Sequence, residues 1–394
     1  MKILLVSQFY YPERFSVTDI AESFVKAGHE VTVLTGKPNY GYGKIIEAYK
    51  KIKYEEINGV KIHRVNLVPR KHSRISIIRN YLSFHNNAKH FVRYFKEEFD
   101  VVLSISLSPV ISISPALLYA KKHHVPCVLY CQDLWPESTL ITGAVKKRSL
   151  MYKILFRWSK SIYKRCDRIV ISSPSFKDYF VNELGIENKI FNVVHQPILY
   201  STRHLEPTIY KNEHNFIYAG NIGKIQLVDH LIDAMKFVKT KDVKLHIIGM
   251  GSELENIKAK IEKEKISNVI YDGAFPIEKA EAFYSNADAL IVSLKNEGYV
   301  GRTIPNKAIQ YMKYGKPILA VVGGDSKTML ESAKGAVFAS ENAENIAEKI
   351  DILCNMSKKE KDLLGLNNQK YFEENLTTNK LTQLLLDELI ASKK

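Results

Sequence analysis

Cysteine is scarce in this sequence, and the residue patterns that usually bind metal ions are missing from it. The four cysteines are scattered over 394 residues, and Cys127 and Cys131 lie in an apolar run that predicts a buried strand. This usage argues against a disulfide framework and fits a reducing compartment. The sequence has no Cys-x-x-Cys, no Asp-x-Asp and no pair of histidines at helical spacing. We therefore expect neither a metal nor another cofactor.

Long hydrophobic runs are also missing. The first segment, MKILLVS, turns polar after six residues, whereas a bilayer span needs about 20 apolar residues. Hydrophobic residues make up 45% of the chain and charged residues 25%, a balance typical of folded globular proteins. We expect a folded protein in the cytoplasm.

Negative charge is in short supply. The 57 lysines and arginines outnumber the 42 aspartates and glutamates, which gives a net charge of +15. Residues 70–96 contain seven lysines and arginines and no acidic residue, and residues 145–165 repeat this pattern with eight. Such a surplus attracts anions, for example nucleic acid, lipid headgroups or phosphorylated ligands.

Short apolar runs alternate with longer helical patterns along the chain. The apolar runs predict buried parallel strands at 2–7, 30–35, 101–106, 126–131 and 168–173, and again at 216–220, 243–249, 289–293 and 317–323. This alternation predicts an α/β protein with two doubly wound, Rossmann-like domains. Ligands of such sheets bind at the carboxyl ends of the strands, which we expect to face a central cleft.

The alternation is interrupted once, at residues 195–214. This polar stretch contains two prolines and no sustained period, so we place the interdomain linker there. We expect one domain at 1–198 and a second at 199–375. Residues 376–394 then contain a helix whose docking partner the sequence does not indicate.

Two glycine-containing turns follow strands of the second domain. Gly223 and Lys224 follow strand 216–220, and Gly249 and Gly251 end the next strand. A glycine turn at the start of a helix exposes backbone N–H groups and a positive dipole end, which suits a diphosphate. The same glycines could instead serve only to let helices pack closely.

A helix is predicted to begin near Pro305. Asn306 and Lys307 would lie in its first turn, and Gln310 one turn later on the same side. A lysine in a first helical turn is unfavourable to the helix dipole, which hints that an anion compensates it.

The segments GNIGK, GMG, NEG and PNKAIQYMKYGKP, in this order, resemble those of the family 4 glycosyltransferases, which are retaining enzymes of the GT-B fold. The resemblance covers nearly the whole chain. QFYYPE, TGKPNYGYGK, QDLWPES and AGNIGKIQ are similar, more narrowly, to the capsule and O-antigen subgroup that includes N-acetyl-L-fucosamine transferases. The resemblance implies a metal-independent hexosyltransferase-type enzyme of class EC 2.4. Its donor would be a UDP-sugar and its acceptor an undecaprenyl-diphosphate-linked sugar, bound by the second and first domains respectively.

The resemblance also implies roles for single residues. Glu297 would hydrogen-bond the donor sugar and Lys307 the diphosphate. Gln310 stands where the family usually has a glutamate that binds the ribose, so we expect a weaker grip, because neutral hydrogen bonds contribute ~0.5–1.5 kcal/mol against ~1.5–3 for charged ones. The predicted donor-binding residues are Gly223, Lys224, Gly249, Gly251, Glu297, Arg302, Asn306, Lys307 and Gln310.

In the first domain, strand 126–131 leads into Gln132 and Asp133. Many members of the family carry a histidine before this aspartate, so a histidine base is absent here. The resemblance implies that the leaving phosphate deprotonates the acceptor, while Asp133 orients the acceptor or stabilises positive charge. Asp133 could instead cap a helix before Leu134. The predicted catalytic residues are Asp133, Glu297 and Lys224, and the predicted acceptor-binding residues are Tyr11, Glu13, Arg14, Asp133 and Trp135.

Residues 145–165 predict a basic amphipathic helix. Its apolar stripe consists of Met151, Ile154, Leu155, Trp158 and Ile162. Such a helix suits an anionic membrane surface, so we expect a peripheral position on the inner face of the cell membrane. A helix packed on the core with a solvated basic back would have the same pattern.

Two other functions fit parts of the sequence. A UDP-sugar 2-epimerase would bind a UDP-sugar between two similar domains, but the PNK and QDLWPES segments favour transfer. A nucleic-acid-binding protein is suggested only by the charge, because no recognisable nucleic-acid-binding module is present.

Overall fold

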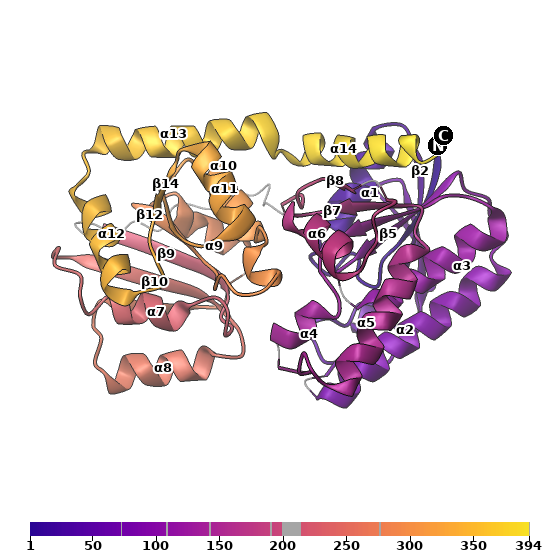
Figure 1. Ribbon diagram of the computed structural model, residues 1–394, viewed down its shortest axis with the longest axis horizontal. Helices are drawn as coiled ribbons and strands as arrows, with labels where there is room; N and C mark the ends of the chain where they lie inside the picture. Colours follow the sequence, from indigo (N-terminus) through magenta and orange to yellow (C-terminus); the bar gives the residue numbers. More distant parts are fainter. Residues whose placement is uncertain are drawn as a thin grey trace. The chain divides into compact units, whose positions relative to one another are not determined.

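The computed structural model describes residues 1–71, 73–107, 109–141, 143–189, 191–198, 214–275 and 277–393 (Figure 1). The chain divides into two compact units. Unit 1 consists of Met1–Leu199 and Thr378–Lys394, and unit 2 consists of Tyr200–Thr377. Most of the predicted linker at 195–214 lies outside the described residues.

Unit 1 is built on an eight-stranded sheet with the order β3-β4-β2-β1-β5-β6-β7-β8. All neighbouring strands are parallel except β3, which runs antiparallel to β4 at the edge. The strands are β1 (Lys2–Val6), β2 (Glu30–Gly36), β3 (Tyr54–Ile57), β4 (Val60–Val65), β5 (Val101–Ser106), β6 (Cys127–Cys131), β7 (Arg168–Ile171) and β8 (Phe191–Val193).

The helices of unit 1 follow these strands along the chain. They are α1 (Val17–Lys26), α2 (Arg74–Tyr94), α3 (Ser114–His123), α4 (Glu137–Ile141), α5 (Leu150–Lys164), α6 (Ser175–Asp178) and α14 (Thr378–Ala391), with the short turns η1 (Glu47–Tyr49), η2 (Val110–Ile113) and η3 (Tyr179–Glu183).

Unit 2 is built on a six-stranded parallel sheet with the order β11-β10-β9-β12-β13-β14. Its strands are β9 (His214–Asn221), β10 (Val243–Met250), β11 (Val269–Gly273), β12 (Ala289–Ser293), β13 (Ile318–Val321) and β14 (Ala336–Phe338). Its helices are α7 (Val228–Ala234), α8 (Leu254–Lys263), α9 (Ile277–Tyr284), α10 (Asn306–Lys313), α11 (Gly324–Ala333), α12 (Ala343–Asn355) and α13 (Lys358–Asn375), with the short turn η4 (Val300–Arg302).

All nine strands predicted from apolar runs are confirmed. Every residue of β5, β6 and β12 is buried, because these inner parallel strands are covered on both faces. The five strands that the sequence did not indicate are β3, β4, β8, β11 and β14. They are short or contain partly exposed residues, so their side chains do not form an apolar run.

The C-terminal helix α14 packs on unit 1, where it contacts α1. Leu381, Leu385, Leu386 and Leu389 belong to the same buried core cluster as Ile20 and Phe24 of α1. Figure 1 shows α14 in yellow close to the N-terminus of the chain, to which its own end returns. The end of the sequence thus completes the core of the unit in which the sequence begins. Among the described residues, no helix is long and apolar enough to cross a membrane.

Candidate functional site

Lys307 is the most unusual charged residue of unit 2. It lies in the first turn of α10, which begins at Asn306 as the sequence predicted. Its Nζ is buried and has no hydrogen-bond partner among the described residues. The ring of Tyr218 lies beside it, with its centroid 3.7 Å from Nζ. Because burial disfavours the charged form, the pKa of Lys307 falls to about 7.

The end of β9 is held against α10 by a side chain. The hydroxyl of Tyr311 accepts a hydrogen bond from the backbone N–H of Ala219 at 2.9 Å and donates to the carbonyl of Ala219 at 3.1 Å. Lys307 lies one turn before Tyr311, so this contact brings its ammonium group to the carboxyl end of β9. A Cβ placed on Gly220 would lie 3.2 Å from Nζ of Lys307.

Gln310 adds a second donor without a partner on the same helix. Its Nε2 is buried and makes no hydrogen bond among the described residues. A buried donor left unpaired costs about 1–3 kcal/mol, and a buried unpaired charge costs more. A ligand with acceptor atoms, most favourably an anion, would supply a partner for the ammonium group of Lys307 and for Nε2 of Gln310.

The turn that contains Gly223 and Lys224 differs from the prediction. The sequence placed it at the start of a helix, but α7 begins only at Val228, because Leu227 takes a left-handed conformation with φ of 53°. The turn therefore presents no helix N-terminus to a ligand, and that argument for a phosphate site at Gly223 is wrong. Lys224 is exposed and forms no ion pair among the described residues, and its donor contact stays a prediction.

Gly249 lies in β10, one residue before the strand ends, as the predicted strand at 243–249 indicated. A Cβ at Gly249 would lie 1.9 Å from the carbonyl oxygen of Gly220, and one at Gly251 would lie 2.1 Å from that of Ile222. These two glycines allow the ends of β9 and β10 to approach closely. This is the packing role that the sequence left open as the alternative, and a donor contact of either glycine stays a prediction.

Glu297 lies on the exposed loop that follows β12. Its carboxylate pairs with Lys295 at 2.7 Å, and this neighbour lowers its pKa. The loop is fixed at its base, since the N–H of Lys295 donates to the carbonyl of Ile225 at 2.8 Å and that of Asn296 donates to the carboxylate of Glu341 at 3.0 Å. The loop after β9 and the loop after β12 are thus joined. The contact of Glu297 with a donor sugar stays a prediction.

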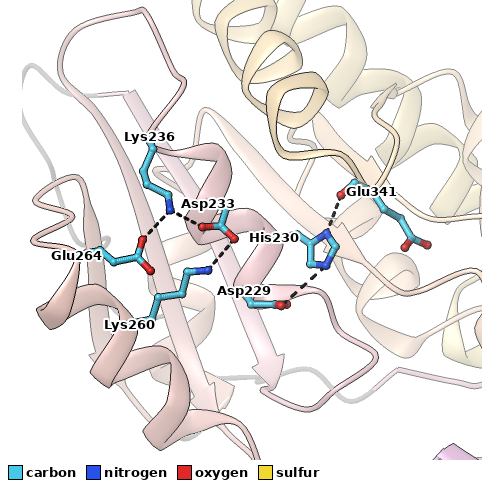
Figure 2. Close-up of polar contacts among 7 residues, drawn as sticks. All are labelled: Asp229, His230, Asp233, Lys236, Lys260, Glu264 and Glu341. Atoms are coloured by element: carbon cyan, nitrogen blue, oxygen red, sulfur yellow. Dashed lines mark hydrogen bonds and ion pairs between the residues drawn. The ribbon is translucent and has the colours of Figure 1, made fainter.

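Glu341 links this loop to α7 as well. Its backbone carbonyl lies 2.7 Å from Nδ1 of His230 in α7 (Figure 2). In the same figure, Asp233 of α7 accepts hydrogen bonds from Lys236 and Lys260. The sequence did not indicate Glu341 as a site residue, because it lies far along the chain and outside any motif. Arg302 and Asn306, also predicted donor contacts, are exposed in η4 and at the start of α10.

Unit 1 carries a group of buried polar atoms at the carboxyl ends of its central strands. These atoms have no hydrogen-bond partner among the described residues. They are Oε1 of Gln8 after β1, the hydroxyls of Ser104 and Ser106 in β5, and both amide atoms of Gln132 after β6. β1, β5 and β6 are neighbours in the sheet. These atoms can bind a hydroxyl-rich ligand. The sequence gave no signal for the serines except as polar residues inside an apolar run.

Asp133 follows Gln132 and is not a helix cap. The helix α4 begins only at Glu137, so the alternative role as N-cap residue is wrong. The carboxylate of Asp133 accepts hydrogen bonds from Ser138 and from the backbone of Leu134, which favour the ionised form. Burial outweighs them and raises the pKa of Asp133 to about 7. Trp135, a predicted acceptor contact, is half-buried in the same loop.

Glu13 makes structural hydrogen bonds inside unit 1. The residue is buried, and its Oε1 accepts hydrogen bonds from the backbone N–H groups of Asn39 at 2.6 Å and Tyr40 at 2.5 Å. It therefore fixes the loop after β2. Tyr11 and Arg14, on either side of it, are exposed, and acceptor contacts of all three stay predictions.

The helix α5 lies within the predicted amphipathic segment, but the residues of the predicted apolar stripe are not all buried. Ile162 is fully buried, whereas Met151, Ile154 and Trp158 are 56%, 52% and 38% exposed. The face that packs on unit 1 instead includes Tyr152, Ser159 and Tyr163. The helix is thus both packed on the core and apolar toward solvent.

No group of three or more metal-ligating side chains occurs among the residues that the structure describes. The expected independence of metal stays a prediction.

Comparison with known proteins finds a glycosyltransferase family match in each part of the chain. Residues 15–198 match the family described as Glycosyltransferase Family 4, and residues 202–369 match that described as Glycosyl transferases group 1. The chain is 26% identical over 273 residues to the "Probable glycosyltransferase WbjE" of Pseudomonas aeruginosa. The aligned region covers 65% of this chain and 66% of WbjE, just under two thirds of that relative.

Solved structures with a similar fold align with nearly the whole chain. HepE of Anabaena, solved in complex with UDP-glucose, has a TM-score of 0.70 at 12% identity, covering 99% of this chain and 100% of its own. WaaG, a glycosyltransferase involved in lipopolysaccharide biosynthesis, has a TM-score of 0.69 at 14% identity, covering 99% of each chain. These similarities establish the fold, which is GT-B.

Proposed function

For this chain, which consists of a Glycosyltransferase Family 4 domain followed by a Glycosyl transferases group 1 domain in a GT-B fold, we propose transfer of a sugar from a UDP-sugar to a lipid-linked saccharide. The observation that carries the proposal is the buried, unpartnered ammonium group of Lys307 at the carboxyl end of the unit 2 sheet. A diphosphate supplies the negative charge that this group lacks.

The donor binds to unit 2 in this proposal. Lys307 contacts the diphosphate, Gln310 donates from Nε2 to the nucleotide, and Glu297 hydrogen-bonds the sugar from its exposed loop. Lys224 adds charge from the neighbouring turn, to which the loop of Glu297 is joined. The solved complex of HepE with UDP-glucose supports a nucleotide-sugar donor in this fold.

Transfer proceeds with retention of configuration and without a metal. The leaving phosphate takes the proton of the acceptor hydroxyl, because Gln132 stands where a histidine base would be needed. Asp133 orients the acceptor or stabilises positive charge at the anomeric carbon. The unpaired amide of Gln132 and the two β5 serines bind acceptor hydroxyls, since each can donate and accept hydrogen bonds.

The donor site is tested by a thermal-shift comparison of UDP, GDP and buffer without divalent metal. A ligand at a hundredfold excess over its Kd stabilises the native state by about 2.7 kcal/mol. We expect UDP to raise the Tm of the wild type and to lose this effect in Lys307→Met, which keeps the length of the side chain. Lys263→Ala, which removes an exposed lysine of α8, is the control and should respond like the wild type. If UDP has no effect on the wild type, the donor assignment is wrong.

In this proposal, the surface of unit 1 that carries α2 and α5 lies against a membrane. Besides the stripe of α5, the helix α2 exposes Ile75, Ile78 and Leu82 at helical spacing, and both helices contact η2. Lysines and arginines accompany both stripes, so anionic lipid attracts this surface. Sedimentation with anionic liposomes should show binding that weakens as salt rises. Absence of binding at low salt would exclude the membrane part.

The product class is a bacterial surface polysaccharide, such as capsule or O-antigen, and N-acetyl-L-fucosamine is the donor sugar to test first. WaaG, which shares the fold, acts in lipopolysaccharide biosynthesis. Incubation with UDP-sugar alone distinguishes transfer from epimerisation. An epimerised sugar formed without acceptor would replace the transferase proposal by a 2-epimerase.

A further inference from the structure

The helix α5 presents three different faces along its length. One face packs on unit 1, and a second consists of the exposed side chains Met151, Ile154 and Trp158. The third carries four cations at positions 153, 157, 160 and 164, which recur at intervals of three and four residues. An apolar stripe and a basic flank therefore run side by side on one helix.

A cavity opens beside the first half of the basic flank. It has a volume of about 760 Å³ and is lined by Lys147, Arg148, Lys153 and Arg157, by the rings of Tyr152 and Phe156, and by one carboxylate, that of Glu183. None of the four cationic side chains forms an ion pair or hydrogen bond with another described residue. Four cations against one carboxylate make a positive potential that attracts an anion of more than one charge.

This cavity is joined to the loop that carries Asp133. The hydroxyl of Tyr152, which lines the cavity, donates a hydrogen bond to the buried carboxylate of Glu137. The ring of Trp158 packs edge-on against Trp135, with centroids 6.4 Å apart. The loop between β6 and α4 and the start of α4 thus contact α5 at two places, through Tyr152 at the cavity and through Trp158 on the apolar stripe.

We propose that α5 binds the phosphate end of the lipid-linked acceptor. The cavity holds a diphosphate, and the stripe of Met151, Ile154 and Trp158 contacts the first isoprene units attached to it. A diphosphate diester carries two charges, which suits four cations better than the single charge of an ordinary phospholipid. The contacts with the β6–α4 loop then place the sugar of the same molecule near Asp133. This inference rests on the proposed function, because it takes the acceptor to be lipid-linked.

The test uses farnesyl diphosphate, a short polyprenyl diphosphate, below its critical micelle concentration. Trp135 and Trp158 are the two tryptophans of the whole sequence, so intrinsic fluorescence reports directly on this region. We expect saturable binding of farnesyl diphosphate that shifts the emission. Inorganic pyrophosphate and farnesol, each of which lacks half of the ligand, should bind at least tenfold more weakly.

Two double variants separate a specific pocket from diffuse attraction. Lys153→Gln with Arg157→Gln removes two charges from the cavity, and we expect at least tenfold weaker binding, because two charge-assisted contacts with the diphosphate are lost. Lys160→Gln with Lys164→Gln removes the same charge from the same flank one to two turns further on, and should change the Kd less than twofold.

Three results would overturn the inference. Equal weakening by both double variants means diffuse electrostatics, and equal binding of pyrophosphate and farnesyl diphosphate means that the stripe contributes nothing. Cavity-dependent binding to phosphatidylglycerol vesicles without binding of farnesyl diphosphate means that the cavity takes a bulk lipid. Failure of the proposed function is distinguishable, because it is measured by the UDP shift at Lys307 in the other unit, which both double variants should retain.

Discussion

Lys307 combines a full side-chain charge with burial and with the lack of any partner among the described residues. An arrangement of this kind lowers stability in the unliganded protein, because the cation loses its hydration without compensation. It is tolerated because burial brings the pKa of the group to about 7, so that the lysine can lose its proton. In the proposed function, a bound diphosphate recovers this cost.

The protonation of Lys307 predicts proton uptake on UDP binding. Above pH 7 the unliganded side chain is largely neutral, whereas a bound diphosphate raises its pKa toward the usual range. UDP affinity should therefore fall as pH rises from 7.5 to 9. Calorimetry at pH 8.5 in two buffers of different ionisation enthalpy should show uptake of up to about one proton. Lys307→Arg, which stays charged, is the control, and equal uptake by this variant would contradict the prediction.

Asp133 predicts that the stability of the folded protein falls as pH rises, because burial raises the pKa of this carboxyl group. Its pKa is about 7 in the folded protein and about 3.9 in an unfolded chain, so its protonation favours folding. This stabilisation is complete below pH 3.9 and is lost as pH rises through 7. From pH 5 to 8 the wild type should lose on the order of 2 kcal/mol more stability than Asp133→Asn. Urea unfolding followed by tryptophan fluorescence measures this, because both tryptophans lie in unit 1. The variant Asp387→Asn, at an exposed aspartate, should behave like the wild type.

At the scale of elements, the ends of strands position the candidate residues within each unit. β9 and β10 approach so closely at Gly220 and Gly249 that a side chain at Gly249 would overlap a backbone oxygen. The hydrogen bonds of Tyr311 with Ala219 place the end of β9 beside α10, where Lys307 lies. In unit 1, the ends of β1, β5 and β6 gather unpaired polar atoms in the same way. The carboxyl edge of each sheet thus holds the groups that the proposed function uses.

The close approach of β9 and β10 predicts a severe effect of Gly249→Ala. The new Cβ would lie 1.9 Å from a carbonyl oxygen at a φ of 139°, so the strands must separate. We expect a loss of more than about 4 kcal/mol or no folded protein. Gly298→Ala is the matched control, because its φ is 62° but nothing lies within 4 Å of the added Cβ, and it should cost only about 1–2 kcal/mol. Similar stabilities of the two variants, measured by calorimetry, would contradict this account.

At the scale of the whole molecule, the chain crosses between its two units twice. It leaves unit 1 after residue 199 and returns at Thr378, where α14 begins. The leucines of α14 then fill the core beside α1 and β1. The hydrophobic core of unit 1 therefore requires the side chains of α14.

This topology predicts that a change near the C-terminus destabilises unit 1. Leu385 is 1% exposed in the core, and Leu385→Ala should cost about 2–5 kcal/mol. Leu384→Ala, on the neighbouring exposed position, should cost less than about 1 kcal/mol because that side chain is 42% exposed. Tryptophan fluorescence during urea unfolding measures both. Equal effects of the two substitutions would mean that α14 does not pack as described.

The apolar runs of the sequence determined the α/β class, the two domains and the strands that carry the site. Covered parallel strands need continuous apolar residues, and this requirement is visible in the sequence itself. The first turn of α10 was predictable for the same reason, because Pro305 and the pattern after it indicate a helix start. The roles assigned to Lys307, Glu297 and Asp133 came from motifs and from chemistry that their side chains can perform.

The tertiary structure alone decided which of these groups are buried and unpaired. Burial of Lys307 depends on Tyr218, which is distant in sequence, and on Tyr311, which lies one turn later on the same helix and holds α10 against the end of β9. The position of the loop after β12 depends on Glu341, which is also distant in sequence. The left-handed Leu227 moved the start of α7, and the position of α14 required a core that forms only when both ends of the chain meet. A sequence pattern records which residues prefer to be buried or to turn, but not which distant partner satisfies them. Those partners exist only in the folded chain.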